Sequence, residues 1–149
     1  MTVQERCELA NEYLKKTMNC CQRMLLVFTD VTGLTEEQSM AIASGMGHGL
    51  CFGSVCGALN GAVMVLGMAH PHTVAGGLDA KRRSKAITVE FERRVKEKFG
   101  ALECRDLLGK TEGGGSDFAA ALAHGNHCMM MTYTIIELLC EYLEELKEE

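Results

Sequence analysis

The sequence lacks tryptophan, has a single proline and contains few aromatic residues. It also lacks long apolar runs, because no stretch of about 18 consecutive apolar residues occurs. The N-terminal segment MTVQERCELANEY has charged residues where a signal peptide would have its apolar core. We therefore expect a cytoplasmic protein that is not embedded in a membrane.

An excess of basic residues is also missing. Fifteen Lys and Arg against 20 Asp and Glu give a net charge of −5 and a pI near 5.6. Because neutralising phosphates requires a basic surface, we expect no nucleic-acid partner. No Ser/His/Asp arrangement, H-E-x-x-H motif or paired-carboxylate motif indicates a catalytic class, so the sequence leaves enzymatic activity and any substrate open.

Strand patterns are absent as well, since no alternating run rich in Val or Ile is bounded by turn residues. The length of 149 residues fits one ordinary domain. The predicted fold is therefore all-α: a single domain over 1–149, built as a compact bundle of about six or seven helices.

Apolar spacing and capping residues place the predicted helices along the chain. The segment 50–69 is the most apolar and glycine-rich, and we expect it to contain the central helix. On that helix Gly53, Gly57 and Gly61 would form a row that lets a neighbouring backbone approach closely. A glycine-rich loop is predicted over 110–117. The predicted helices cover 2–17, 20–31, 36–46, 56–69, 78–99, 104–108, a short segment before 125, and 127–146.

Eight cysteines are many for a chain with no sign of secretion, which favours metal or redox use over a disulfide framework. Four of them share one setting, the first turn of a predicted helix, where the macrodipole favours the thiolate. If these helix starts converge, the thiolates could ligate an anionic iron–sulfur cluster. The four are Cys20, Cys56, Cys104 and Cys128.

The other thiols and the nearby histidines have less definite roles. Cys7 and Cys140 fall on apolar helix faces and are interpreted as core residues. Cys21 and Cys51 are additional thiols close to the four, and Cys51 could form a redox couple with Cys56. His127 adjoins Cys128, while a loop histidine such as His48 is more typical of a surface position than of a ligand.

The ordered motifs resemble a known family, the redox-active proteins named for their C-GCAxxG-C-C pattern. The resemblance rests on Asn19-Cys20, on the run Cys56-Gly-Ala-Leu-Asn-Gly61, on Cys104-Arg105, and on Cys128 at the last helix. It spans about residues 10–145 and implies a small helical protein with a redox role, often associated with transport. A similar domain lies beside an iron–sulfur site in split-Soret cytochromes. Because no C-x-x-C-H motif is present, haem is not expected.

Three functions stay open at this point. The leading hypothesis is an iron–sulfur centre held by the four cysteines, for electron transfer or redox sensing. The second is a thiol–disulfide protein without metal, and the third a structural zinc site or an interaction module with inert thiols. If the protein carries an iron–sulfur centre, its expected partner is a redox protein or a transport-associated protein. The glycine row also allows a homodimer.

Overall fold

A computed structural model describes residues 1–108, 117–123 and 126–149 of the chain. Within these ranges every regular element is helical, and the one β-type feature is an isolated antiparallel bridge. This confirms the predicted all-α class. Most of the loop predicted over 110–117, and the helix break predicted at 125, lie outside the described residues.

The helices follow the predicted order. Their bounds are α1 Val3–Lys15, α2 Cys20–Leu26, α3 Thr29–Thr32, α4 Glu36–Ile42, η1 Gly49–Gly53, α5 Gly57–Ala69, α6 Leu78–Phe99, α7 Cys104–Leu108, α8 Asp117–Ala123 and α9 His127–Lys147. Two short elements, α3 and η1, were not predicted as separate helices. No described helix combines the length and the hydrophobicity that crossing a bilayer requires.

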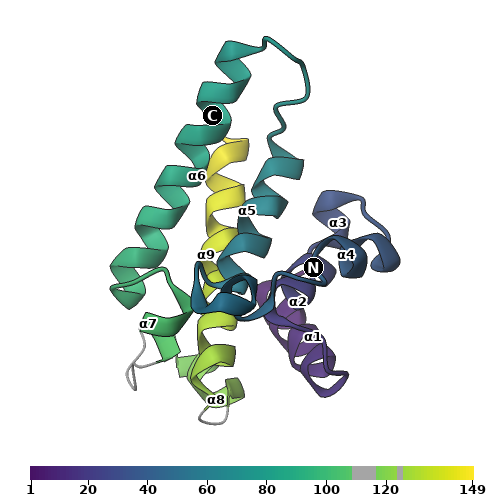
Figure 1. Ribbon diagram of the computed structural model, residues 1–149, viewed down its shortest axis with the longest axis vertical. Coiled ribbons are helices and arrows are strands. Elements are labelled where there is room, and N and C mark those ends of the chain that lie inside the picture. The colour runs from purple at the N-terminus through teal and green to yellow at the C-terminus, as the bar shows by residue number, and fades with distance from the viewer. Residues whose placement is uncertain (109–116, 124–125) are drawn as a thin grey trace.

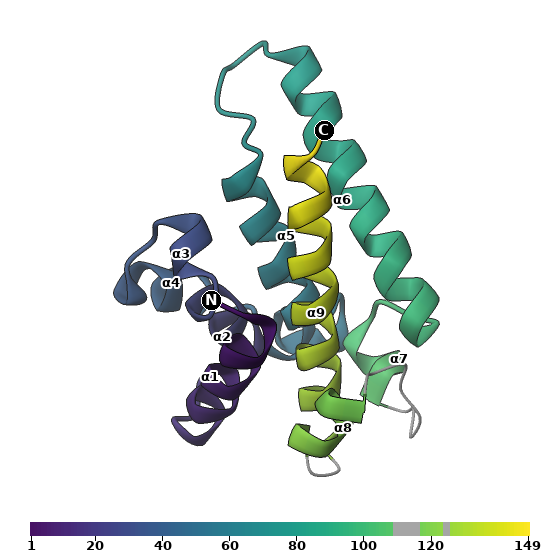
Figure 2. The ribbon, with the colours of Figure 1, turned by 180° about the vertical axis from the view of Figure 1, so that it is seen from behind.

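Two helices organise the bundle. The long helix α9 packs against α1, α5, α6 and α8, and α5 packs most extensively against α2. Figures 1 and 2 show α5, α6 and α9 running side by side, with α1 and α2 beside the lower part of α5 and α9, on the side away from α6. The ends of α5, α7 and α9 that carry cysteines therefore lie at the same end of the bundle as α2.

The predicted glycine row is confirmed at two of its three positions. A Cβ added at Gly61 would lie 2.6 Å from Met24 Cβ of α2, and one added at Gly57 would overlap Cys20 Sγ. Glycine is thus required where α5 meets α2. Gly53 instead precedes α5, with φ of 76°, and its missing side chain makes room for Arg105 of α7.

Two predicted helices are too long. The helix expected over 36–46 ends at Ile42. The segment expected to be helical over 20–31 breaks after Leu26, because Phe28 has φ of −121° and begins the separate turn α3. Gly33, with φ of 70°, ends that turn in the left-handed conformation that glycine adopts readily. Val27 and Phe28 are fully buried at the break, so tertiary packing of these side chains overrides local helix propensity.

Candidate functional site: a cavity lined by four cysteines

Two of the four cysteines begin helices that polar residues cap. Cys20 is the first residue of α2, and Asn19 caps that helix by accepting from the Gln22 N–H at 2.9 Å. Cys128 is the second residue of α9, and Asn126 caps it in the same way. The predicted first-turn setting is therefore confirmed for both residues.

The other two cysteines are brought together by the isolated antiparallel bridge. The Cys56 N–H donates to the Leu102 carbonyl at 2.9 Å, and the Cys104 N–H donates to the Ser54 carbonyl at 2.7 Å. The bridge pairs Val55 with Glu103, and each cysteine follows its bridge residue by one position. Because successive side chains on extended backbone alternate between two faces, Cys56 and Cys104 both point to the face opposite that of Val55 and Glu103. Cys104 begins α7, as predicted, whereas Cys56 is the N-cap of α5 and so precedes the helix.

All four sulfur-bearing side chains line one cavity of about 270 Å³. We call it the four-cysteine cavity. Arg23 of α2 and His48 also line it, and the half-exposed Leu108 of α7 forms part of its mouth. Segments that are far apart in the sequence thus converge, as the sequence analysis supposed.

Electrostatics at the cavity differ from the prediction. Burial raises the pKa of Cys56 to about 12, although the backbone N–H groups of Leu59 and Ala58 at the helix start act to lower it. Burial likewise raises the pKa of Cys104 and of Cys128. At Cys56, desolvation therefore outweighs the N–H groups of the helix start, and in the metal-free protein all three thiols are protonated at neutral pH.

The four sulfurs lie within electrostatic reach of one another. A negative charge on Cys20 further raises the pKa of Cys56, Cys104 and Cys128, whereas the Arg23 guanidinium lowers that of Cys128. Cys20 is thus close to each of the other three.

His48 is exposed, as predicted, and its ring also reaches the site. The His48 Nδ1 lies 3.5 Å from Cys104 Sγ. The residue starts a run of four consecutive positive φ angles, 50° to 59°, over 48–51. Left-handed conformation costs a non-glycine residue about 1–2 kcal/mol, so the fold maintains strain in the turn that holds this imidazole.

The described residues contain no group of three or more His, Cys, Asp or Glu side chains close enough to hold a single metal ion. All eight cysteines are free thiols. Tetrahedral zinc requires thiolates about 3.8 Å apart, given Zn–S bonds of about 2.3 Å. The four sulfurs share a cavity, but among the described residues no three of them form a group that could hold one such ion.

The remaining cysteines lie outside this cavity. Cys7 is buried in the core, as predicted, and Cys21 is fully buried on α2. Cys51 is exposed in the left-handed turn, and its Sγ approaches the Gly45 carbonyl at 3.8 Å. His127 does not line the cavity, although its Nε2 is buried without a hydrogen-bond partner.

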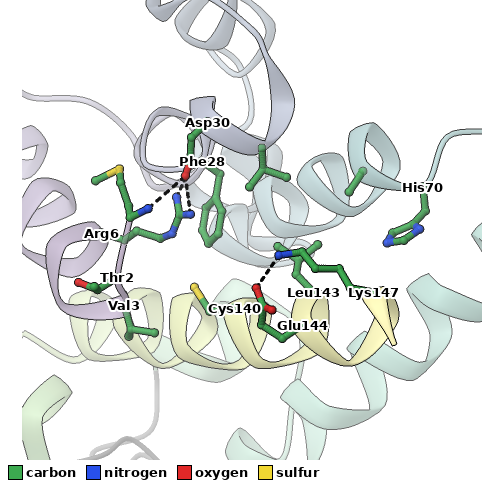
Figure 3. A pocket seen from close by; sticks show the side chains of 13 residues that line it. Thr2, Val3, Arg6, Phe28, Asp30, His70, Cys140, Leu143, Glu144 and Lys147 are labelled. Atoms are coloured by element: carbon green, nitrogen blue, oxygen red, sulfur yellow. Dashed lines mark hydrogen bonds and ion pairs between the residues drawn. The ribbon is translucent and has the colours of Figure 1, made fainter. Parts of the chain in front are cut away.

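Cys140, interpreted as core, is partly buried against the core and also lines a second cavity of about 630 Å³ between α1, α3 and α9 (Figure 3). There the buried Arg6 forms a two-pronged ion pair with Asp30, at 2.7 and 2.8 Å, and stacks 4.2 Å over the Phe28 ring. The same guanidinium lowers the Cys140 pKa, but burial outweighs it and raises that pKa.

Sequence reasoning missed two residues of the four-cysteine cavity, His48 and Arg23. His48 has a weak signal, because it is the histidine within a glycine-rich loop just before the motif. Arg23 has none, since an arginine on a predicted amphipathic helix normally faces solvent. Only the packed structure shows that Arg23 is buried, with 5% of the residue exposed.

A small all-α domain with four helix-start cysteines around one cavity defines a cysteine-rich protein with a thiol site. Comparison with protein families gives the particular class: a family model described as "Putative redox-active protein (C_GCAxxG_C_C)" matches residues 18–142. The chain belongs to this family, and the family match supports a redox-active protein. No curated protein and no solved structure matches the chain.

Proposed function

We propose that the four-cysteine cavity holds an iron–sulfur cluster and that the protein uses it for electron transfer or redox sensing. The ligands would be Cys20, Cys56, Cys104 and Cys128. The observation that carries this proposal is the convergence of four thiols, from four separate helix starts, on one cavity. Such a cluster supplies one-electron chemistry through thiolate-bound iron.

The lack of a compact three-donor group among the described residues favours a cluster over a single zinc ion. In a cluster of four irons each thiolate binds a different iron, so its ligands lie further apart than the ligands of one ion. This agrees with a shared cavity in which, among the described residues, no three donors meet around one point.

The raised pKa values support metal binding over disulfide exchange. Exchange needs a thiolate, and burial keeps Cys56, Cys104 and Cys128 protonated near neutral pH. A coordinating metal deprotonates a thiol outright, so ligation remains available to the same residues. Binding would then release protons and be weaker at low pH.

Anaerobic reconstitution with ferrous iron and sulfide tests the proposal. We expect the wild-type protein to bind both in stoichiometric amounts and to show visible absorption and, after reduction, an electron paramagnetic resonance signal. Single Ser variants of the four cysteines should lose most of this signal. The matched control is Cys51→Ser, because Cys51 is exposed outside the cavity and should leave iron content unchanged. A wild-type protein without iron and sulfide, or equal losses in the control, contradicts the proposal.

A thiol–disulfide protein is the second candidate, supported by the electrostatic proximity of Cys20 to three other thiols. Thiol titration distinguishes it from the cluster proposal. A cycling pair lowers the free-thiol count by two on mild oxidation in metal-free buffer, and reductant restores the count. A cluster protein instead releases iron on oxidation and shows no defined two-thiol step.

A further inference from the structure

Arg23 is a buried cation without a negative partner. The residue is 5% exposed, its guanidinium donates to the Met18 carbonyl, and its buried Nε has no hydrogen-bond partner among the residues that the structure describes. Within the described parts of the chain, no carboxylate forms an ion pair with it, whereas the equally buried Arg6 is paired with Asp30. A buried charge normally has a partner, because desolvation is costly.

The surroundings of Arg23 identify where the missing negative charge belongs. The Arg23 side chain lines the four-cysteine cavity. Cys20, which also lines it, lies one helical turn before Arg23 on α2. Cys128 of α9 lines the same cavity. The guanidinium, unpaired among the described residues, therefore belongs to a cavity whose four cysteines become negative when they bind metal.

We propose that Arg23 is the counter-ion of the four-cysteine cavity and stabilises negative charge there. Metal-bound thiolates or a small anion that enters the cavity would supply this charge. The inference deepens the proposed function, but it does not require a cluster, because it concerns the charge that the cavity accepts. Arg23 acts through electrostatics and is a positioning residue for whatever anion the site holds.

Alkylation of the metal-free protein tests the charge directly. Iodoacetate and iodoacetamide have nearly the same size and reaction, but only iodoacetate is negatively charged. At a given thiol, both reagents depend equally on the accessibility of the sulfur and on the fraction present as thiolate. The ratio of their rates is therefore independent of these two factors and reports the electrostatic potential at the thiol. Peptide mass spectrometry gives the ratio at Cys20 and at Cys128, with the exposed Cys51 as an internal reference.

We expect the iodoacetate-to-iodoacetamide ratio at Cys20 and Cys128 to fall about fivefold in Arg23→Gln, the factor for one charge pair at contact distance even in a water-like dielectric. Arg23→Lys should keep the ratio near wild type. The matched control is Arg105→Gln, which removes the same charge from an exposed position on α7. An unchanged ratio in Arg23→Gln, an equal fall in Arg105→Gln, or a Lys variant as low as Gln overturns the inference.

The reconstituted protein separates the two sources of negative charge. If a cluster is the anion, Arg23→Gln should lower its midpoint potential, because removing a cation disfavours the more negative reduced state. A potential that does not change, or that rises, contradicts the role of Arg23 toward a cluster. If the wild-type protein binds no cluster, the proposed function fails, while the alkylation ratio still decides whether Arg23 serves a small anion.

Discussion

Gly57→Ala is the sharpest test of how the site is built. Gly57 is the first residue of α5, and a Cβ there would overlap Cys20 Sγ and lie 2.9 Å from the Met46 carbonyl oxygen. The sulfur could rotate away, but the backbone oxygen could not without moving its segment. The substitution should therefore displace the segment around Met46 and turn the Cys20 side chain away from its place in the cavity.

The magnitude follows from two opposing effects. Added methyl groups in a packed core cost about 1–3 kcal/mol, and a clash with a backbone atom argues for the upper half, about 2–3 kcal/mol. Replacing glycine by alanine in a helix returns at most about 1 kcal/mol. The net loss for Gly57→Ala is about 1–2 kcal/mol, or a fall in Tm of several degrees.

The matched control is Gly67→Ala on the same helix. Gly67 is exposed, and a Cβ there would meet nothing within 4 Å, so alanine should stabilise the protein by about 0.5–1 kcal/mol. Urea unfolding of both variants gives the comparison, with Cys20 alkylation as a local readout. If Gly57→Ala is as stable as Gly67→Ala, α2 and α5 do not approach as closely as described.

Three further predictions concern caps, pH and ion pairing. Asn19→Ala should lower the free energy of unfolding by about 1–2 kcal/mol in urea titrations, because α2 loses its N-cap and the site loses an anchor to the Ala43 carbonyl. Folded-state thiol pKa values of about 12, against an ordinary 9.0, make the folded state hold protons that the unfolded state releases. Stability under reducing conditions should then be full below pH 9 and fall between about pH 9 and pH 12; equal urea midpoints at pH 8 and pH 10.5 would contradict this. The thiols concerned are Cys7, Cys21 and Cys56. Asp30→Asn should cost about 1–2 kcal/mol in the same assay by leaving the buried Arg6 unpaired, and an Arg6→Met, Asp30→Asn double variant should be less destabilised than additivity predicts.

Local signals in the sequence were sufficient for most helices. Capping boxes begin α1, α2 and α4 with both reciprocal hydrogen bonds in place. These signals work because each depends on groups within four residues of one another. They failed after Leu26, where buried Val27 and Phe28 end the helix by contacts with distant residues.

Long-range effects explain what was misjudged at the site. The macrodipole argument placed four cysteines in first turns of helices, which is confirmed for all but Cys56, the N-cap of α5, but it predicted more acidic thiols. Burial, which depends on the whole fold, reverses the sign at Cys56, Cys104 and Cys128. In the same way, no local pattern shows that the His48 ring meets Cys104 or that Arg23 is buried.

By itself, the sequence determined an all-α chain, the four cysteines at helix starts and the glycines that permit close packing, because these depend on spacing along the chain. Only the tertiary structure decided that the four thiols share one cavity, since the α2–α5 contact and the bridge between residues 55 and 103 join segments far apart in the sequence. The tertiary structure also added the buried guanidinium of Arg23 and the imidazole of His48 to that cavity, because burial and charge are properties of the assembled fold.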